Sequence, residues 1–296
     1  MIGLRTFLKA SLARAYAAGG GLRRLHAGRL VVLTFHRVRV GGEAPHQRAM
    51  RILDVAVPDF RRILSWMRER YEPVALGDWI GRDAPPARPS FAVTFDDGWA
   101  DNYANAFPVL RELGIPATVF VATGAVEDRT PFWWQNSVLS NAEIEKLKKQ
   151  SHPGIEPWLA DLPDLRKAHD GDFLTWEQIR EMGRSGLVTF GPHGHRHALM
   201  DLLSREEAIE DLRRCWSLLK DRAPDALVPV LAWPNGNARD DLAADLEAMG
   251  LRAAVGTGRG APATASEARW NLPRNNVDRN VARNPGLLPW LLMRAR

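Results

Sequence analysis

Two adjacent carboxylates in the sequence could form part of a metal site. Asp96 and Asp97 directly follow a short apolar run at residues 91–95 and precede Gly98. Side by side, such carboxylates repel each other, and a bound cation would allow both to stay ionised. The same Asp-Asp-Gly sequence is also common in solvated surface turns. The pair therefore becomes a candidate site only if further ligands lie close to it.

Two histidines four positions apart could complete this site. His193 and His197 follow an apolar run at residues 187–190, and their spacing predicts a helical turn with both imidazoles on one side. Two histidines and one carboxylate are a frequent metal-binding set that leaves positions open for water and substrate. His195, between them, should point away from the ion. Because Cys215 is the only cysteine, a cysteine-based metal site is excluded.

Alternating strand and helix patterns surround these residues. Short apolar runs typical of buried strands occur at 30–35, 91–95, 117–121, 187–190, 227–233, 251–255 and 272–277. Repeated strand–helix units indicate parallel strands with right-handed crossovers. We expect an α/β fold, a distorted (β/α) barrel with about seven parallel strands. An open doubly wound sheet is the alternative.

Polar or aromatic residues follow several of these strands and are expected at one face of the domain. His36 follows the run at 30–35, Trp233 ends the run at 227–233 and Pro234 follows it, and Arg274 lies in the last extended segment. In parallel α/β folds, ligands bind at the carboxyl ends of the strands. These side chains should therefore share a face with the carboxylates and histidines described above.

The net charge of +5 is concentrated at one end of the chain. Residues 1–30 contain six basic side chains and no acidic one, and the remaining 34 basic residues nearly balance the 35 acidic ones. A nucleic-acid-binding protein would spread a basic face over its folded domain, so no nucleic-acid partner is expected. Lys9 and Arg14 interrupt the apolar stretch that a signal peptide needs. No run is long enough to span a bilayer.

We divide the chain into a basic amphipathic segment, residues 1–29, and one domain, residues 30–296. Large apolar side chains recur in the first segment at helical spacing, at Leu4, Leu8, Leu12 and Tyr16. Such a helix either lies on an anionic membrane surface or packs on the domain. Within the domain, an excursion over one end is expected at about residues 124–174. The predicted location is cytoplasmic or peripheral at the membrane surface.

Three motifs resemble those of the polysaccharide deacetylases, the NodB-homology group of carbohydrate esterase family 4. Residues 94–98 read Thr-Phe-Asp-Asp-Gly and match the TFDDG motif of the family. Residues 193–197 look like its H-x-x-x-H motif, and residues 232–236 look like its third motif. The resemblance covers roughly residues 30–280, and the distorted barrel of the family agrees with the strand pattern.

The resemblance implies a hydrolase that removes the N-acetyl group of an amino sugar in a polysaccharide or lipid-linked glycan. It implies that Asp96 is the general base and that Asp97, His193 and His197 bind one divalent metal. Zinc is the expected ion, and cobalt or nickel would also suit these ligands. The particular glycan, the acyl group and the oligomeric state are not specified by the sequence.

The sequence departs from the family at two residues. No histidine follows His197, so the usual general-acid histidine of a late strand is absent. His36 is the predicted replacement, because the first and last strands of a closed barrel are neighbours; a purely structural role stays open. This resembles the permuted exopolysaccharide deacetylases of the poly-N-acetylglucosamine type. The base-orienting arginine before the third motif is also missing. Arg274 is its candidate replacement, which beside Asp96 would keep that carboxylate ionised.

Substrate contacts and alternative functions complete the expectations. Trp133, Trp134 and Trp233 could stack on sugar rings, with Pro234 forming part of a groove wall. A deformylase or other small-acyl amidase acting on a lipid-linked sugar is one alternative. A non-catalytic carbohydrate-binding module is another, but it predicts loss of the base or of a ligand. A phosphoesterase would need more carboxylate or asparagine ligands and a phosphate-binding glycine loop.

Overall fold

The computed structural model describes residues 4–41, 51–82, 84–129, 131–135, 139–150 and 172–295. Within these ranges, strands form at all seven apolar runs identified in the sequence. They are β1 (Leu30–Phe35), β5 (Ser90–Phe95), β6 (Ala117–Val121), β7 (Val188–Pro192), β8 (Val230–Ala232), β9 (Ala253–Val255) and β10 (Asn275–Asn276). Every pairing between them is parallel.

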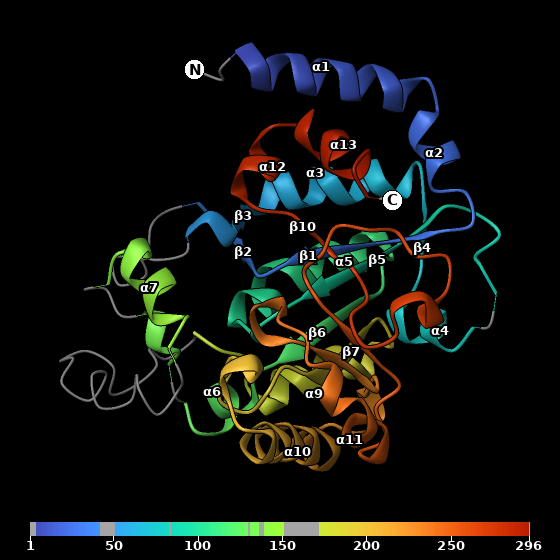
Figure 1. Cartoon of the computed structure of the whole chain (residues 1–296). Coiled ribbons are helices and arrows are strands. Elements are labelled where there is room, and N and C mark those ends of the chain that lie inside the picture. Colours follow the sequence, from blue (N-terminus) through green and yellow to red (C-terminus); the bar gives the residue numbers. More distant parts are fainter. Residues whose placement is uncertain are drawn as a thin grey trace.

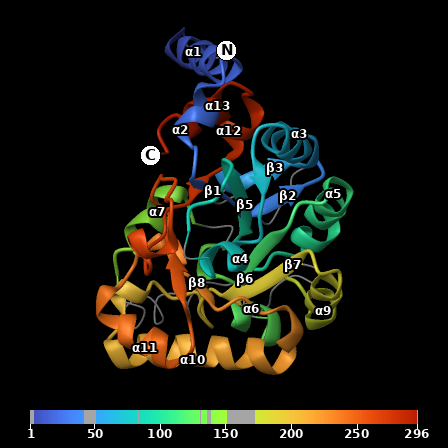
Figure 2. The same ribbon diagram turned by 90° about the vertical axis from the view of Figure 1, so that its right-hand side faces the viewer.

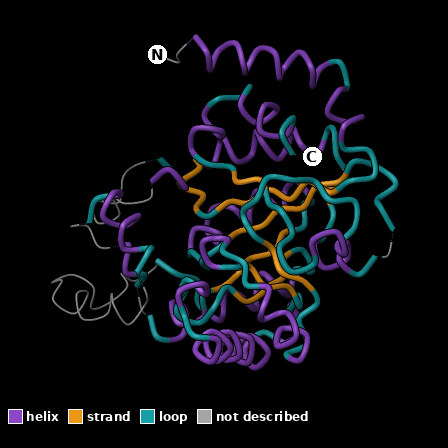
Figure 3. The backbone as a smooth tube through the Cα atoms, in the orientation of Figure 1, coloured by secondary structure: helices purple, strands orange, loops and turns teal. Residues whose placement is uncertain are grey.

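The strands, which lie at the centre of the molecule (Figure 3), form a ring with two weak joints. Hydrogen-bonded neighbours run in the order β10-β1-β5-β6-β7, and β8 pairs separately with β9. A single parallel bridge between Phe190 and Leu227 joins β7 to the segment before β8. A second bridge, between Val255 and Leu272, joins β9 to the segment before β10. The predicted distorted (β/α) barrel is therefore confirmed, and the open sheet is not observed.

Strand β1, the first strand of the ring in sequence, lies between β5 and β10. It pairs with β5 over all six residues, from Leu30 opposite Ser90 to Phe35 opposite Phe95. On its other side it pairs with β10, with Leu33 opposite Asn275. The neighbourhood of the first and last strands, which the assignment of His36 required, is thus present in the structure.

Alternate residues of each strand pack on opposite faces, as the period of two in a strand requires. One set forms the smaller apolar cluster, which includes Leu30, Val32, Ala92, Phe120, Val230 and Val255. The intervening residues join the larger cluster with the surrounding helices. His36 continues the series of Leu30 and Val32, and Asp96 continues that of Ala92. The site residues are therefore set on the same face as the smaller cluster.

Helices surround the strands (Figure 2). They are α3 (Val57–Arg68), α4 (Leu76–Ile80), α5 (Phe107–Leu113), α9 (Trp176–Arg184), α10 (Arg205–Arg222), α11 (Ala243–Ala248), α12 (Arg279–Arg283) and α13 (Leu287–Leu292). Thr175 and Ser204 form capping boxes at the start of α9 and α10. Gly114, with φ of 60°, ends α5 in the left-handed conformation that glycine adopts at little cost.

Some details of the elements differ from the sequence pattern. The run at 227–233 yields only three strand residues in β8, because Pro229 has no N–H to donate to a ladder. Three short strands were not predicted: β2 (Arg37–Arg39), β3 (Asp54–Ala56) and β4 (Glu72–Pro73). Strand β2 pairs with β3 outside the ring, and β4 joins the edge of β5. Their sequences are too short and polar to show a strand period.

Two segments lie outside the barrel (Figure 1). At the N-terminus, α1 (Leu4–Ala18) lies across α13 and is followed by α2 (Gly21–Leu25). From the expected excursion, the structure describes α6 (Thr123–Glu127), a short 3-10 helix (Trp133–Gln135) and α7 (Asn141–Leu147). The rest of the excursion, at 130, 136–138 and 151–171, lies outside the described residues. Among the described helices, none is both long and apolar enough to cross a membrane.

Candidate metal and catalytic site

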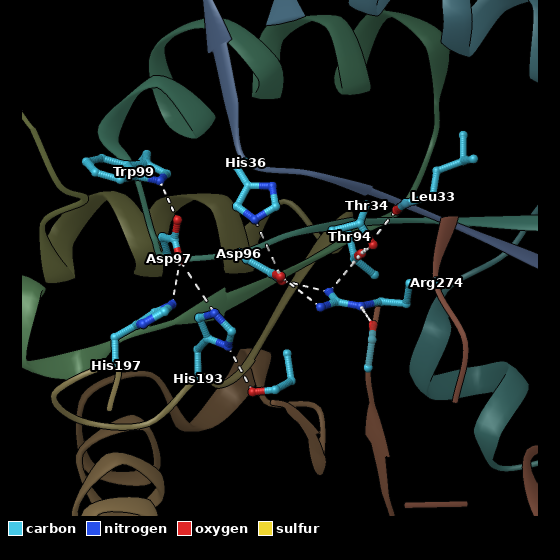
Figure 4. A network of polar contacts seen from close by, with 12 residues as sticks. Leu33, Thr34, His36, Thr94, Asp96, Asp97, Trp99, His193, His197 and Arg274 are labelled. Atoms are coloured by element: carbon cyan, nitrogen blue, oxygen red, sulfur yellow. Dashed lines mark hydrogen bonds and ion pairs between the residues drawn. The ribbon is translucent and has the colours of Figure 1, made fainter. Parts of the chain in front are cut away.

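A cavity of about 340 Å³ lies where the strands β1, β5 and β7 end. Eight of the residues singled out in the sequence line it: His36, Asp96, Asp97, Trp133, Trp134, His193, His197 and Arg274. They come from segments that are far apart in the sequence, and the closed ring of parallel strands brings them together. Figure 4 shows six of these side chains converging on one another.

Asp97, His193 and His197 form a buried group with the donor atoms of a metal site (Figure 4). Oδ1 of Asp97 lies 3.4 Å from Nε2 of His193 and 3.1 Å from Nε2 of His197. Nδ1–H of His193 donates a hydrogen bond to the Ala232 carbonyl at 2.8 Å. This bond leaves the lone pair of Nε2 facing the carboxylate when the ring is neutral. The lone pair and the carboxylate oxygen repel each other. A cation between these atoms would remove the repulsion, so the donor set fits a divalent metal.

The carboxylates favour positive charge at His193, whereas burial lowers the pKa of His197 below its ordinary value. Burial acts to lower the pKa of His193, but Asp96 and Asp97 raise it above its ordinary value. Burial acts to raise the pKa of Asp97, but the two imidazoles hold it well below its usual range. A bound divalent cation would supply this positive charge while the imidazoles stay neutral and free to coordinate.

The backbone is strained at two of the three candidate ligands. Asp97 has φ of 78° and His197 has φ of 53°, in the left-handed region that costs a non-glycine residue about 1–3 kcal/mol. Residues 193–197 form a bend and not the helical turn that the i, i+4 spacing predicted. That prediction was wrong because Gly194, with φ of 75°, reverses the chain immediately after His193. The two imidazoles meet across the bend, with ring centroids 4.7 Å apart.

The bend is held by groups that the sequence did not reveal. Buried Asp211 on α10 accepts hydrogen bonds from the backbone N–H of His195 at 2.7 Å and of Arg196 at 3.2 Å. The N–H of Gly124 donates to the His195 carbonyl at 2.7 Å, and a Cβ on Gly124 would lie 2.7 Å from that oxygen. The His195 imidazole contacts Thr123. It lies outside the metal group, as expected.

Arg274 binds Asp96 through two hydrogen bonds (Figure 4). Its two terminal nitrogens lie 2.7 Å from Oδ1 and 2.7 Å from Oδ2 of Asp96, and its Nε–H donates to the Gly256 carbonyl at 2.7 Å. The side chains are 0% and 4% exposed. Burial acts to raise the pKa of Asp96, but the Arg274 guanidinium, with help from His193 and His36, lowers it below its ordinary value.

His36 lies on the other side of Asp96. Its Nε2 is 4.0 Å from Oδ2 of Asp96, and the side chain is 18% exposed in the cavity. The segment that carries it is fixed by the chain after the TFDDG motif. Asn102 donates to the His36 carbonyl at 2.9 Å, and Asp101 accepts from the N–H of Val38 at 2.9 Å. Residues 102–106 form a π-helix, an element that often occurs at functional sites.

Trp99 fixes the second oxygen of Asp97. Its indole N–H donates to Oδ2 of Asp97 at 2.8 Å, and its ring stacks on Phe173 with centroids 4.8 Å apart. The guanidinium of Arg37 lies 4.2 Å from the centre of the indole ring. The role of Trp99 was not identified from the sequence. Its position directly after Asp-Asp-Gly was the available signal, because an indole there can reach the neighbouring carboxylate.

Two of the predicted aromatic contacts lie at the cavity. Trp133 and Trp134 both line it. The ring of Trp134 meets the edge of His197, with centroids 4.5 Å apart, and stacks on Phe132 at 4.6 Å. Trp134 therefore restricts His197 on one side and bounds the cavity on the other.

The other two predicted contacts, Trp233 and Pro234, do not line the cavity. Trp233 is fully buried in the larger apolar cluster, and its indole N–H donates to the Trp270 carbonyl at 2.7 Å. Pro234 is buried as well. The prediction that these two residues contact substrate is corrected accordingly. Asn235 and Gly236, the next residues, reach the cavity wall instead.

The fold and the site define a (β/α) barrel with an Asp-His-His set that fits a divalent metal and a second carboxylate beside it. Residues 83–254 match the family model described as polysaccharide deacetylase. Because this match covers more than half of the sequence, the chain belongs to the polysaccharide deacetylase family, a family of carbon–nitrogen hydrolases. The family and the fold inferred from the three motifs are thus confirmed.

Two curated relatives match parts of the chain. The poly-beta-1,6-N-acetyl-D-glucosamine N-deacetylase of Escherichia coli (strain K12) is 31% identical over 169 residues, which is 55% of this chain and 20% of that protein. The protein YxkH of Bacillus subtilis (strain 168), named as a polysaccharide deacetylase, is 29% identical over 97 residues, or 31% of this chain and 32% of that protein. The match thus spans about a third or less of either relative's length.

Solved structures share the whole fold. The Streptococcus pyogenes deacetylase PplD in complex with acetate superimposes with a TM-score of 0.65 at 19% identity, covering 89% of this chain and 98% of that chain. IcaB from Ammonifex degensii superimposes with a TM-score of 0.63 at 22% identity, covering 88% and 97%. At these identities the similarity demonstrates the fold of the barrel.

Removal of the Arg274 guanidinium should strongly destabilise the protein. In Arg274→Met, the buried Asp96 carboxylate loses its paired charge, and breaking such a buried pair costs about 3–5 kcal/mol. The free energy of unfolding of the metal-free protein, measured by urea denaturation, should fall by this amount. The control Arg213→Met breaks an exposed pair with Glu210 and should change stability by less than about 1 kcal/mol. Equal effects of the two changes would contradict the assignment.

Loss of the Trp99 indole N–H should weaken metal binding. In Trp99→Phe, Oδ2 of Asp97 loses its hydrogen bond and the carboxylate can rotate, which typically lowers metal affinity about 10–100-fold. Zinc affinity should be measured by competition with a chromophoric chelator. The control Trp216→Phe removes a similarly buried indole, which donates to the Met249 carbonyl and does not line the cavity. The two variants should differ clearly, and similar zinc affinities would show that Trp99 does not position Asp97.

Proposed function

We propose that this protein is a metal-dependent N-deacetylase that hydrolyses the N-acetyl group of an amino sugar in a polysaccharide or lipid-linked glycan. One observation carries the proposal: the Asp96 carboxylate, held by two hydrogen bonds from Arg274, shares a cavity with the Asp97–His193–His197 group. This pairs a fixed proton acceptor with a set of side chains that fits a metal, which is the combination that metal-assisted hydrolysis of an amide uses. We assign the chemistry to one catalytic domain, residues 30–296.

Each side chain has a separate role in this proposal. Asp97, His193 and His197 would hold one divalent ion, with zinc expected and cobalt or nickel also suited to the ligands. When bound, the ion would supply Lewis-acid polarisation of the acyl carbonyl. Asp96 is the general base. Arg274 uses one lone pair on each Asp96 oxygen, which leaves further lone pairs to accept a proton.

The proton movements follow from the positions of Asp96 and His36. Asp96 removes a proton from the attacking water, whose oxygen adds to the carbonyl carbon. The carbon–nitrogen bond then breaks, and His36 protonates the departing amine nitrogen. The products are acetate and a free amino sugar. His36 is suited to this step because it reaches the cavity beside Asp96 from the neighbouring strand, β1.

The cavity wall and the relatives support a glycan substrate. Trp133 and Trp134 bound the cavity with aromatic rings, which offer flat apolar surfaces to the faces of a sugar. Its volume of about 340 Å³ lies near the lower end of the range for small-molecule sites. The E. coli relative is named for poly-beta-1,6-N-acetyl-D-glucosamine. Together with His36 on the first strand, this favours an exopolysaccharide of that type.

Acetate release should depend on both the metal and Asp96. Protein stripped with a chelator should release no acetate from N-acetylglucosamine oligomers, and added zinc or cobalt should restore release. Asp96→Asn should lower the rate about 100- to 10,000-fold, because the base is lost. Circular dichroism must confirm folding, since Arg274 loses its countercharge in this variant. The control Asp221→Asn alters an exposed carboxylate on α10 and should keep full activity.

Two outcomes of this experiment would change the proposal. Stoichiometric metal binding without acetate release would indicate a different small acyl group, such as formyl, or a lipid-linked substrate. Failure to bind any metal would exclude the mechanism and favour a non-catalytic carbohydrate-binding module.

Replacement of His36 should affect amides more than activated esters. An amine must be protonated as it leaves, whereas 4-nitrophenolate leaves without protonation. His36→Gln should therefore lower deacetylation of N-acetylglucosamine oligomers about 100-fold or more, with little change in metal-dependent hydrolysis of 4-nitrophenyl acetate. Equal losses on both substrates would assign His36 a positioning role in place of general-acid catalysis.

A further inference from the structure

Helix α1 packs on the domain through small side chains. Ala13 is fully buried, and Ala10 lies so close to Gly286, just before α13, that a Cβ at Gly286 would be 2.4 Å from the Cβ of Ala10. Nζ of Lys9 lies 5.6 Å from the centre of the Trp290 ring of α13. The position of α1 is therefore fixed by the face of the helix that contains its small residues.

The opposite face of α1, which we call the outer face, consists of large apolar side chains. Its members are Leu4, Phe7, Leu8, Leu12 and Tyr16, which are 73%, 60%, 58%, 61% and 39% exposed. A surface helix normally turns its large apolar residues toward the core, and α1 does the reverse. Figures 1 and 2 show α1 as the outermost element at its end of the molecule. The Tyr16 ring packs against Gly21 of α2, whereas Leu4, Phe7, Leu8 and Leu12 stay exposed in the part of the chain that the structure describes.

The charge around the outer face selects the kind of surface that it fits. Residues 1–30 contain six basic side chains and no acidic one. Arg14 of α1 and Arg23 and Arg24 of α2 are exposed. A second copy of this chain docked on the same face would bring two such basic segments together, which repel. An anionic surface would attract them instead.

The shape of α1 favours a lipid surface over a folded partner. The outer face is a row of aliphatic and aromatic residues along one projecting helix, with Leu4, Leu8 and Leu12 one turn apart. Such a helix, with cations beside its apolar face, lies in the plane of the headgroup region with the apolar side chains among the acyl chains. A helix that binds in this way does not need a groove on its partner and does not cross the bilayer.

We infer that α1 is a membrane-surface anchor that binds anionic phospholipid bilayers through its outer face. The apolar side chains supply the contact with the acyl chains, and the arginines supply attraction to the headgroups. The small-residue face remains packed on α13, so the helix would hold the whole domain at the surface. This inference does not depend on the deacetylase activity.

Sedimentation of the full chain with vesicles tests the anchor. The protein should bind vesicles of phosphatidylglycerol mixed with phosphatidylcholine more tightly than vesicles of phosphatidylcholine alone, and added salt should weaken binding. Leu8→Glu and Leu12→Glu should each lower the partition coefficient at least about tenfold. The control Val40→Glu changes a side chain that is 69% exposed outside α1 and should bind like the unaltered protein.

The fold and the alternative partner are checked on the same proteins. Because Leu8 and Leu12 are exposed, both variants should keep the unaltered melting temperature, and their acetate release from soluble oligomers should not change. Equal vesicle binding by Leu8→Glu, Leu12→Glu and Val40→Glu would overturn the anchor. An absence of vesicle binding would also overturn the anchor. If analytical ultracentrifugation then showed a dimer that Leu8→Glu dissociates, the outer face would be an interface between two copies of the chain.

Discussion

The buried pair between Arg274 and Asp96 is the interaction on which the rest of the site depends. An isolated carboxylate in this position would be protonated or would destabilise the fold, because burial strongly disfavours an unpaired charge. The guanidinium fork holds both oxygens of Asp96 and keeps it ionised. Arg274 adjoins β10 and Asp96 follows β5, so the pair spans β1 and requires that β10, β1 and β5 lie side by side.

Closure of the ring organises the metal group. Asp97 follows β5 and His193 follows β7. The Nδ1–H of His193 donates to the Ala232 carbonyl of β8, which lies across the joint between β7 and β8. The two strained ligands, Asp97 and His197, adopt backbone conformations that the isolated loops would not favour. The Trp99 indole donates to Asp97, and Asp211 on α10 accepts from the backbone N–H groups of His195 and Arg196, which precede His197. Packing of the barrel thus offsets the backbone strain and holds the donor atoms in place.

Much of the fold and of the site could be predicted, because buried strands appear as apolar runs and the candidate site residues directly follow them. The seven strands, the ring and the Arg274–Asp96 contact follow from apolar runs and from the polar residues after them. The bend at 193–197 could not be predicted, because spacing alone does not show that Gly194 takes positive φ. Nor could the burial of Trp233, since an aromatic at a strand end can face either side. Supports such as Asp211 lie in ordinary helical sequence and carry no local signal.

The two single bridges that complete the ring give the barrel a seam. Strands β8 and β9 share a ladder with each other but meet their neighbours through one bridge on each side. A unit attached so lightly can shift as a body while the five-stranded arc around β1 stays rigid. It also carries Ala232, whose carbonyl fixes the tautomer of His193. Because Gly256, directly after β9, also accepts a hydrogen bond from Arg274, a shift of this unit would move supports of both His193 and the Arg274–Asp96 pair.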